Sequence, residues 1–311
     1  MISKFLDPKN DFAFKKIFGT ERNKDILLHF LNDMIVFKEK KPIQKVQFLK
    51  TVQDPEIAAK KMSIVDVLCE DEDHNIYIVE MQVANQSGFE KRAQYYAAKA
   101  YINQMNKGDN RYENLKEVIF LAIVDFTMFP DKEAYKSDHV ILDQETYTND
   151  LKGFSFTFLE LKKFHKKSDE LHTMIEKWAY YFKHAEETSE RELSEIFKDD
   201  TIIQKAYEEL NRFNWSEIEL RTYERELKNQ WDRQAILDFK IKEATVKGME
   251  EGIAKGMEKC MEKGIEKGME KAKIEIAKKM QQSGMPVEAI ANIIGIPAQE
   301  IKKQLQQESH K

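Results

Sequence analysis

The chain has 311 residues and a mass of 36.7 kDa, which corresponds to about two domains at roughly 150 residues each. Its formal net charge of −5 excludes a protein whose whole surface is basic for nucleic-acid binding, so DNA binding would require a local patch or metal ions. Two cysteines, Cys69 and Cys260, are too few for a disulfide scaffold or a cysteine-based zinc module. No segment reaches the ~18 apolar residues of a membrane span, and the first residues become charged too early for a signal peptide. We therefore expect a cytoplasmic protein without a membrane partner.

The first part of the chain predicts two short helices followed by three strands. Asp7-Pro8 is a common helix start, and apolar residues at helical spacing continue to residue 36 on both sides of a glycine. Residues 43–52 indicate a first strand. Residues 62–83 contain two apolar, β-branched stretches separated by the polar segment EDEDHN, which is the pattern of a β-hairpin.

The second part of the chain changes from mixed structure to helices alone. Residues 88–106 predict a helix, and the nearly continuous apolar run at 117–125 predicts a buried central strand. Further strands are expected at 138–143 and 153–160. From about residue 161 onward, charged amphipathic helix dominates. This order indicates an α/β core followed by a long helical C-terminal extension.

Residues 247–272 form a low-complexity tract with a period of four, in which glycines occupy one position and methionine or isoleucine the next. A four-residue step advances ~400° on a helix of 3.6 residues per turn, so each stripe slips by ~40° per repeat and cannot form a heptad seam. The tract is either a marginal, solvated helix weakened by its glycines or an oligomerisation helix whose glycines admit a neighbouring backbone. Beyond it, Pro286, Gly295 and Pro297 delimit two short helices at 284–305, interpreted as a packing hairpin or a helix-turn-helix-like pair.

The hairpin carries the strongest chemical signal in the sequence. If it folds about Asp73, then Asp66 lies directly opposite Glu80, and Gln82 points to the same side two residues further on. Both faces of the hairpin are otherwise apolar, which predicts that both are covered. Cβ atoms of directly opposed residues lie ~4.5–5.5 Å apart, so two carboxylates there repel each other, and burying either one is costly.

Two arrangements would relieve this repulsion, namely protonation of one carboxyl or a cation between the two. A hard divalent cation such as Mg²⁺ prefers carboxylate oxygens and keeps several waters, one of which Gln82 would orient. In the alternative interpretation, the acids lie at a sheet edge, facing solvent or paired with lysine or arginine. A register slip by one residue would separate the pair.

An aspartate on one strand followed by Glu-x-Lys on the next is the motif of PD-(D/E)XK nucleases, and this chain has Asp66 and then Glu80-Met81-Gln82. With glutamine in the lysine position, it resembles the Rpn family of recombination-promoting nucleases, also described as PD-(D/E)XK nuclease family transposases. The resemblance covers residues 5–165 in ordered segments, namely DPKNDFAFKKIFG, IVEMQ, KRAQYYAAKAY, VIFLAIVDF and FSFTFLELKKF. The repetitive tail with its terminal helical hairpin is also similar to that family.

The resemblance implies a metal-dependent DNA endonuclease with a restriction-endonuclease-like α/β fold, in which helices flank a central mixed sheet. Asp66 and Glu80 match the metal-binding catalytic acids, and Mg²⁺ or Mn²⁺ is the implied cofactor. Gln82 matches the third catalytic position, and Asp11 and Arg92 match motif positions in flanking helices. Glutamine can hydrogen-bond an attacking water but supplies no positive charge.

Basic and aromatic side chains on the helix after the hairpin predict a DNA-binding surface, because one helical face carries Arg92, Tyr95, Tyr96 and Lys99. Lys99 is also a candidate to replace the missing motif lysine, and Lys15 is expected to contact phosphate. Ordinary amphipathic packing is the alternative for the stripe. For Asp11, the alternative is a helix cap or a first-turn acid that favours the helix dipole.

These features predict a nuclease domain at 1–165, a helical extension at 166–246, a repeat helix at 247–283 and a small helical hairpin at 284–311. The predicted function is hydrolysis of phosphodiester bonds in DNA, with a role in promoting recombination, by a homo-oligomer assembled through the C-terminal helices. The rival hypothesis is a non-catalytic DNA- or protein-interaction module that keeps the nuclease fold. The glutamine, the acidic net charge and the repetitive tail favour this rival.

Overall fold

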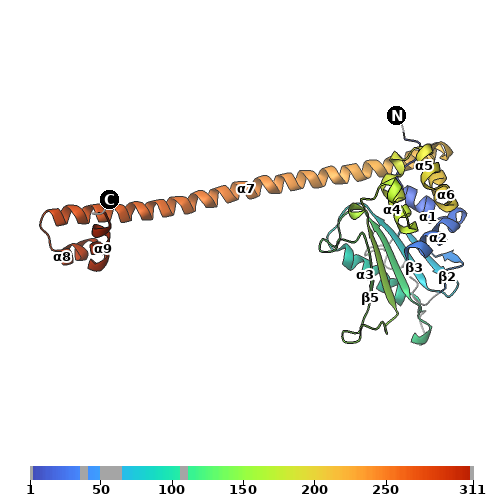
Figure 1. Cartoon of the computed structure of the whole chain (residues 1–311), viewed down its shortest axis with the longest axis horizontal. Helices are drawn as coiled ribbons and strands as arrows, with labels where there is room; N and C mark the ends of the chain where they lie inside the picture. Colours follow the sequence, from blue (N-terminus) through green and yellow to red (C-terminus); the bar gives the residue numbers. More distant parts are fainter. Residues whose placement is uncertain (1–2, 36–40, 50–64, 106–110, 309–311) are drawn as a thin grey trace. The chain divides into compact units, whose positions relative to one another are not determined.

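The computed structural model describes residues 3–35, 41–49, 65–105 and 111–308 (Figure 1). Its sheet consists of strands β1 (Val46–Phe48), β2 (Val67–Asp71), β3 (Ile76–Gln82), β4 (Val118–Val124), β5 (Lys136–Val140) and β6 (Phe154–Glu160), in the order β1-β2-β3-β4-β6-β5. Strands β3, β4 and β6 run parallel to one another, and the other neighbours pair antiparallel. The predicted mixed sheet is therefore confirmed.

The α-helices are α1 (Asp11–Phe18), α2 (Lys24–Met34), α3 (Phe89–Ile102), α4 (Met174–His184), α5 (Glu190–Ile196), α6 (Thr201–Leu210), α7 (Glu217–Gln282), α8 (Val287–Ile294) and α9 (Ala298–Glu308). The strand predicted at 138–143 is β5, which begins two residues earlier because its pairing with β6 starts at Lys136. Residues 50–52 of the predicted first strand, 62–64 of the predicted hairpin and 106 of the predicted helix lie outside the described residues.

Helices cover both faces of the sheet (Figure 1). Successive residues of a strand point to opposite faces, so each strand contributes side chains to two cores. On one face, Tyr77 and Val79 belong to a core shared with α1, α2, α4 and α6. On the other face, Leu68 and Ile78 pack with α3. That helix presents small buried side chains to the sheet, namely Ala93, Ala97 and Ala100. The prediction that both faces of the hairpin are covered is confirmed.

Aromatic rings tie the N-terminal helices to helices late in the chain. The Phe18 ring centroid lies 5.1 Å from that of Phe30 and 5.6 Å from that of Phe182. All three side chains are fully buried, which favours folding by about 1.5–3 kcal/mol each. A backbone hydrogen bond also joins the start of the chain to α6, because the Leu6 amide donates to the Leu210 carbonyl oxygen at 3.0 Å. The segments predicted as nuclease domain and helical extension therefore share one core.

Contacts within the chain divide it into a compact unit at Met1–Gln230 and a second unit at Trp231–Lys311. The second unit has a small core of its own around Ala277, Ile290 and Ile301. Gly295 ends α8 with a φ of +71°, a left-handed conformation that glycine adopts without steric cost. The predicted pair of short helices is thus present as α8 and α9.

The repeat tract is helical throughout and belongs to the 66-residue helix α7. Its apolar side chains face solvent, with Met257 69% and Met261 70% exposed. A Cβ added to Gly256 would meet no atom within 4 Å, so the described part of the chain supplies no neighbour for the glycine stripe. Among the described residues, no helix combines the length and the apolar character needed to cross a membrane.

Candidate active site

The turn of the hairpin fixes which residues face each other. The Asp71 side chain accepts hydrogen bonds from the amides of Asp73 and Asn75 at 2.9 and 2.8 Å. The resulting register pairs Val67 with Val79, Leu68 with Ile78, Cys69 with Tyr77 and Glu70 with Ile76. This is the register predicted from the sequence. Asp66 directly precedes β2 and accepts a 2.9 Å hydrogen bond from the Met81 amide, which places it beside Glu80.

Glu80 is buried with one oxygen unsatisfied. The residue is 6% exposed, and its Oε1 has no hydrogen-bond partner among the described residues. The Asp66 amide donates to the Glu80 carboxylate, but this single bond does not satisfy both oxygens. Leaving a buried acceptor unpaired costs about 1–3 kcal/mol, and more for a charged group. The site is therefore short of a positive ligand or a donor at this point.

Both carboxyl groups have a raised affinity for protons. Burial raises the pKa of Glu80 well above its usual range, and the neighbouring Asp66 carboxylate raises it further. Burial also raises the pKa of Asp66 to about 6, although the charge of Lys15 and the Met81 amide act in the opposite direction. Without a metal ion, the pair therefore favours keeping a proton, which is one of the two arrangements expected from the sequence.

Helix α1 contributes a cation to the pair. Lys15 Nζ lies 3.2 Å from Asp66 Oδ1 and 2.7 Å from Asp11 Oδ1. Burial lowers the pKa of the Lys15 amine, but the hydrogen bond to Asp11 and the charge of Asp66 outweigh this effect and raise it. Asp11 is not the helix cap, since the Asn10 side chain accepts the first amides of α1. Asp11 therefore holds Lys15 rather than contacting the acid pair itself.

Helix α3 orients Gln82. The Gln82 side chain accepts a short hydrogen bond from Arg92 through Oε1 and donates to the Ala84 carbonyl oxygen at 2.9 Å through Nε2. Arg92 also donates to Gln86 at 2.7 Å, and its guanidinium carbon lies 4.9 Å from the Phe89 ring centroid. Its Nε is buried without a partner among the described residues. One donor nitrogen of Arg92 thus stays available beside the acids.

The remaining residues of the predicted DNA-binding stripe behave differently. Tyr95 is 58% exposed and lies on the solvent side of α3. Within the described residues, no ion pair or hydrogen bond joins the Lys99 side chain to either acid. Tyr96, the other tyrosine of the predicted stripe, is half-buried. Burial raises its pKa, with the charge of Arg92 acting against this rise and the charge of Glu80 adding to it. Its position four residues after Arg92 was the signal in the sequence.

The donor set suits a hard divalent cation. Glu80 Oε1 is unpaired, and Mg²⁺ or Mn²⁺ binds carboxylate oxygens while keeping several waters. The described residues contain no group of three or more potential histidine, cysteine or carboxylate ligands, because Lys15 separates Asp11 from the pair. Two protein carboxylates with waters or substrate oxygens completing the shell is the arrangement that Mg²⁺ accepts in phosphate-handling sites.

The comparison with known families places these residues in context. A family model described as PD-(D/E)XK nuclease family transposase matches residues 8–240. The chain belongs to this family. The match includes every residue of the candidate site, the sheet, α1 to α6 and the beginning of α7, which confirms the resemblance noted in the sequence. No curated protein and no solved structure matches the chain.

Proposed function

We propose that this nuclease-family protein is a metal-dependent DNA endonuclease, with Mg²⁺ or Mn²⁺ held by Asp66 and Glu80. The observation that carries the proposal is the unpaired oxygen of Glu80, buried opposite a second carboxylate. When bound, a divalent ion would lower the pKa of a water, stabilise charge at phosphorus and relieve the repulsion between the acids.

The chain's own residues would prepare the reacting groups. The amides of Met81 and Asp66 hold the carboxylates of Asp66 and Glu80 in position. Gln82, oriented by Arg92, has a lone pair on Oε1 left to accept a hydrogen bond from the attacking water. The unpartnered Nε of Arg92 would donate to a phosphate oxygen, and charge-assisted bonds of this kind are about twice as strong as neutral ones.

Lys15 is our candidate for the positive charge that Gln82 does not supply. Its amine already lies against Asp66, and the two bonds that hold it keep it charged. A cation fixed at this place stabilises negative charge that develops on a phosphate bound beside Asp66. Lys99, proposed for this role from helical spacing, has no such contact within the described residues.

The wider assignments rest on the same proposal. DNA is the proposed partner, with the exposed ring of Tyr95 available for stacking and Lys99 for phosphate contact on α3. Self-association through the C-terminal helices would bring two sites together to cut both strands. A cytoplasmic location and a role in recombination remain parts of this proposal, as do the predicted divisions at 246 and 283.

The test is cleavage of supercoiled plasmid by the full-length protein with Mg²⁺, with Mn²⁺ or with EDTA. We expect metal-dependent nicking, and a loss of about 10²–10³-fold in rate for Asp66→Asn and Glu80→Gln. Glu70→Gln is the matched control, because Glu70 lies in the same hairpin but contacts His74 at 3.3 Å instead of the acid pair.

Thermal stability gives a second readout that separates metal binding from catalysis. Mg²⁺ or Mn²⁺ should raise the melting temperature of the wild type and of Glu70→Gln, but not of the two site variants. Folded protein that binds metal without cutting would favour the non-catalytic interaction module. Cleavage that persists in both site variants would overturn the assignment of the acids.

A further inference from the structure

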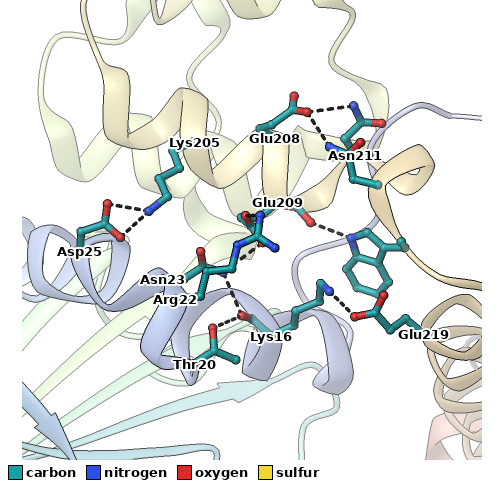
Figure 2. Close-up of polar contacts among 12 residues, drawn as sticks. Lys16, Thr20, Arg22, Asn23, Asp25, Lys205, Glu208, Glu209, Asn211 and Glu219 are labelled. Atoms are coloured by element: carbon teal, nitrogen blue, oxygen red, sulfur yellow. Dashed lines mark hydrogen bonds and ion pairs between the residues drawn. The ribbon is translucent and has the colours of Figure 1, made fainter.

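A cavity lies beside helix α1, with Lys15 in its lining. It has a volume of about 460 Å³, within the ~300–1,000 Å³ typical of small-molecule sites. Residues of α1 and of the turn at Glu21–Asn23 line it together with acids from the end of α6 and the start of α7 (Figure 2). Lys15 lines this cavity and also contacts Asp66, so the cavity adjoins the candidate active site.

One residue in the lining of the cavity, Asn23, has an unsatisfied acceptor. Asn23 is 1% exposed, and its Nδ2 donates to the Lys16 carbonyl oxygen at 3.2 Å and to Glu209 Oε2 at 3.1 Å. Its Oδ1 is buried and has no hydrogen-bond partner among the described residues. An amide oxygen needs a donor, so a molecule bound here must bring an N–H or O–H group. A phosphate dianion alone brings none.

The charged side chains in the lining of the cavity form ion pairs. The Arg22 side chain is 78% exposed and lies 2.9 Å from Glu209 Oε1, whose side chain is only 9% exposed (Figure 2). Lys16 pairs with Glu219 and lies 4.9 Å from the Trp215 ring centroid. Each acid is matched by a cation, and Lys15 is itself paired with Asp11 and Asp66. The exposed guanidinium of Arg22 has five N–H donors, of which the pair with Glu209 does not use all, so it can also bind an anionic group on a ligand.

We propose that this cavity binds one nucleotide, with an amino group of the base on Asn23 Oδ1 and the phosphate at Arg22 and Lys16. A donor at one end and an anion at the other is the polarity of a nucleotide, and the Phe12 ring in the lining offers an apolar surface to the base. The choice of a nucleotide over other anions that carry a hydrogen-bond donor rests on the proposed nuclease function and on Lys15, which lies between the two sites.

The test is isothermal titration of the full-length protein in EDTA, so that the metal site takes no part. The probes are dCMP and dAMP, which carry an exocyclic amine, dTMP, which carries none, and deoxyribose 5-phosphate, which lacks the base. We expect dCMP or dAMP to bind most tightly and the sugar phosphate most weakly. Equal affinity for dCMP and deoxyribose 5-phosphate, or no binding of any probe, overturns the proposal.

Variants separate the cavity from the catalytic acids. Arg22→Ala should weaken dCMP binding about tenfold, whereas Arg191→Ala, which removes a similarly exposed arginine on α5, should not. Asn23→Ser should abolish the preference for dCMP over deoxyribose 5-phosphate. Asp66→Asn should bind dCMP as the wild type does, so loss of cleavage and loss of nucleotide binding are distinguishable. Equal effects of the two arginine variants would contradict the proposal even if Asn23→Ser unfolds.

The source of the nucleotide is distinguished by competition. Displacement of dCMP by an oligo-dC strand would identify the occupant of the cavity as a nucleotide of the DNA substrate. If oligo-dC does not compete while dCMP binds, the occupant is a free nucleotide. Both results support the cavity as a nucleotide site.

Discussion

Two opposing effects set the protonation state of the Asp66 carboxyl: burial favours the protonated form, and the charge of Lys15 favours the carboxylate. Substitution of Lys15 tests the role of this charge. Lys15→Met should reduce the rate of DNA cleavage about 10²-fold, since it removes a positive charge aimed at the site. Lys15→Arg should recover part of the rate. The measurement is single-turnover cleavage, with Lys91→Met on the exposed side of α3 as control. Wild-type cleavage by Lys15→Met would contradict the role.

The acid pair also predicts how stability depends on pH in metal-free protein. The pKa of Asp66 is raised to about 6 in the fold, above the ~3.9 of an unfolded aspartate. The folded state then binds the proton more tightly than the unfolded state, so its stability falls as pH rises from about 4 to about 6. The shift corresponds to at most ~3 kcal/mol.

Urea denaturation in EDTA at pH 4.5 and pH 7 measures this effect. The free energy of unfolding of the wild type should decrease more between these values than that of Asp66→Asn, because titration of other groups is common to both proteins. Parallel pH profiles of the two proteins would show that the carboxyl is not buried as described.

Local patterns were sufficient to find the acid pair, because a hairpin with a fixed turn determines which residues face each other. Local patterns were insufficient to identify the cation that lies beside these acids. Lys99 was singled out by its spacing from Arg92 on one helix, whereas Lys15 reaches Asp66 through the packing of α1 against the sheet. Such docking joins residues 51 positions apart and leaves no periodic signal.

At the scale of elements, α7 is a helix that runs through five glycines without a break. If these glycines admit the backbone of a second copy, the variant Gly252→Ala/Gly256→Ala should weaken self-association in sedimentation equilibrium. Helix content should rise at the same time, because each alanine favours helix by ~0.8–1.0 kcal/mol over glycine. Glu251→Ala, also exposed in the tract, is the control.

Increased helicity with unchanged association would identify the tract as a solvated helix and place the interface elsewhere.

The sequence predicted the elements of the sheet well because strands β3 and β4 are nearly continuous apolar runs. It did not predict that the tract and much of the preceding extension form one helix, since interior glycines lower helix propensity at every repeat.

For the whole molecule, the predicted boundary at 165 reflected a change from strands to amphipathic helices. The structure brings α4 and α6 into the core with α1 and α2, and amphipathic helices give no indication of which surface they cover. A protein ending at residue 240, where the family match ends, should therefore unfold cooperatively at a melting temperature close to that of the full chain.

The same truncated protein should nick plasmid in a metal-dependent way but make fewer double-strand breaks, if two sites are joined through the C-terminal helices. Calorimetry and the ratio of nicked to linear plasmid measure the two expectations. A truncated protein that linearises plasmid as efficiently as the full chain would contradict assembly through the tail.

The hydrogen bond between Leu6 and Leu210 has a consequence for synthesis on the ribosome. The helix that carries Lys15 packs with α4 and α6, so its packing against the sheet is incomplete until the chain has been synthesised to about Leu210. Because a domain folds as a unit once its last element has emerged, the nascent protein would lack an assembled candidate site for two thirds of translation. The proposed activity would thus arise only when the segment that leads into α7 has been synthesised.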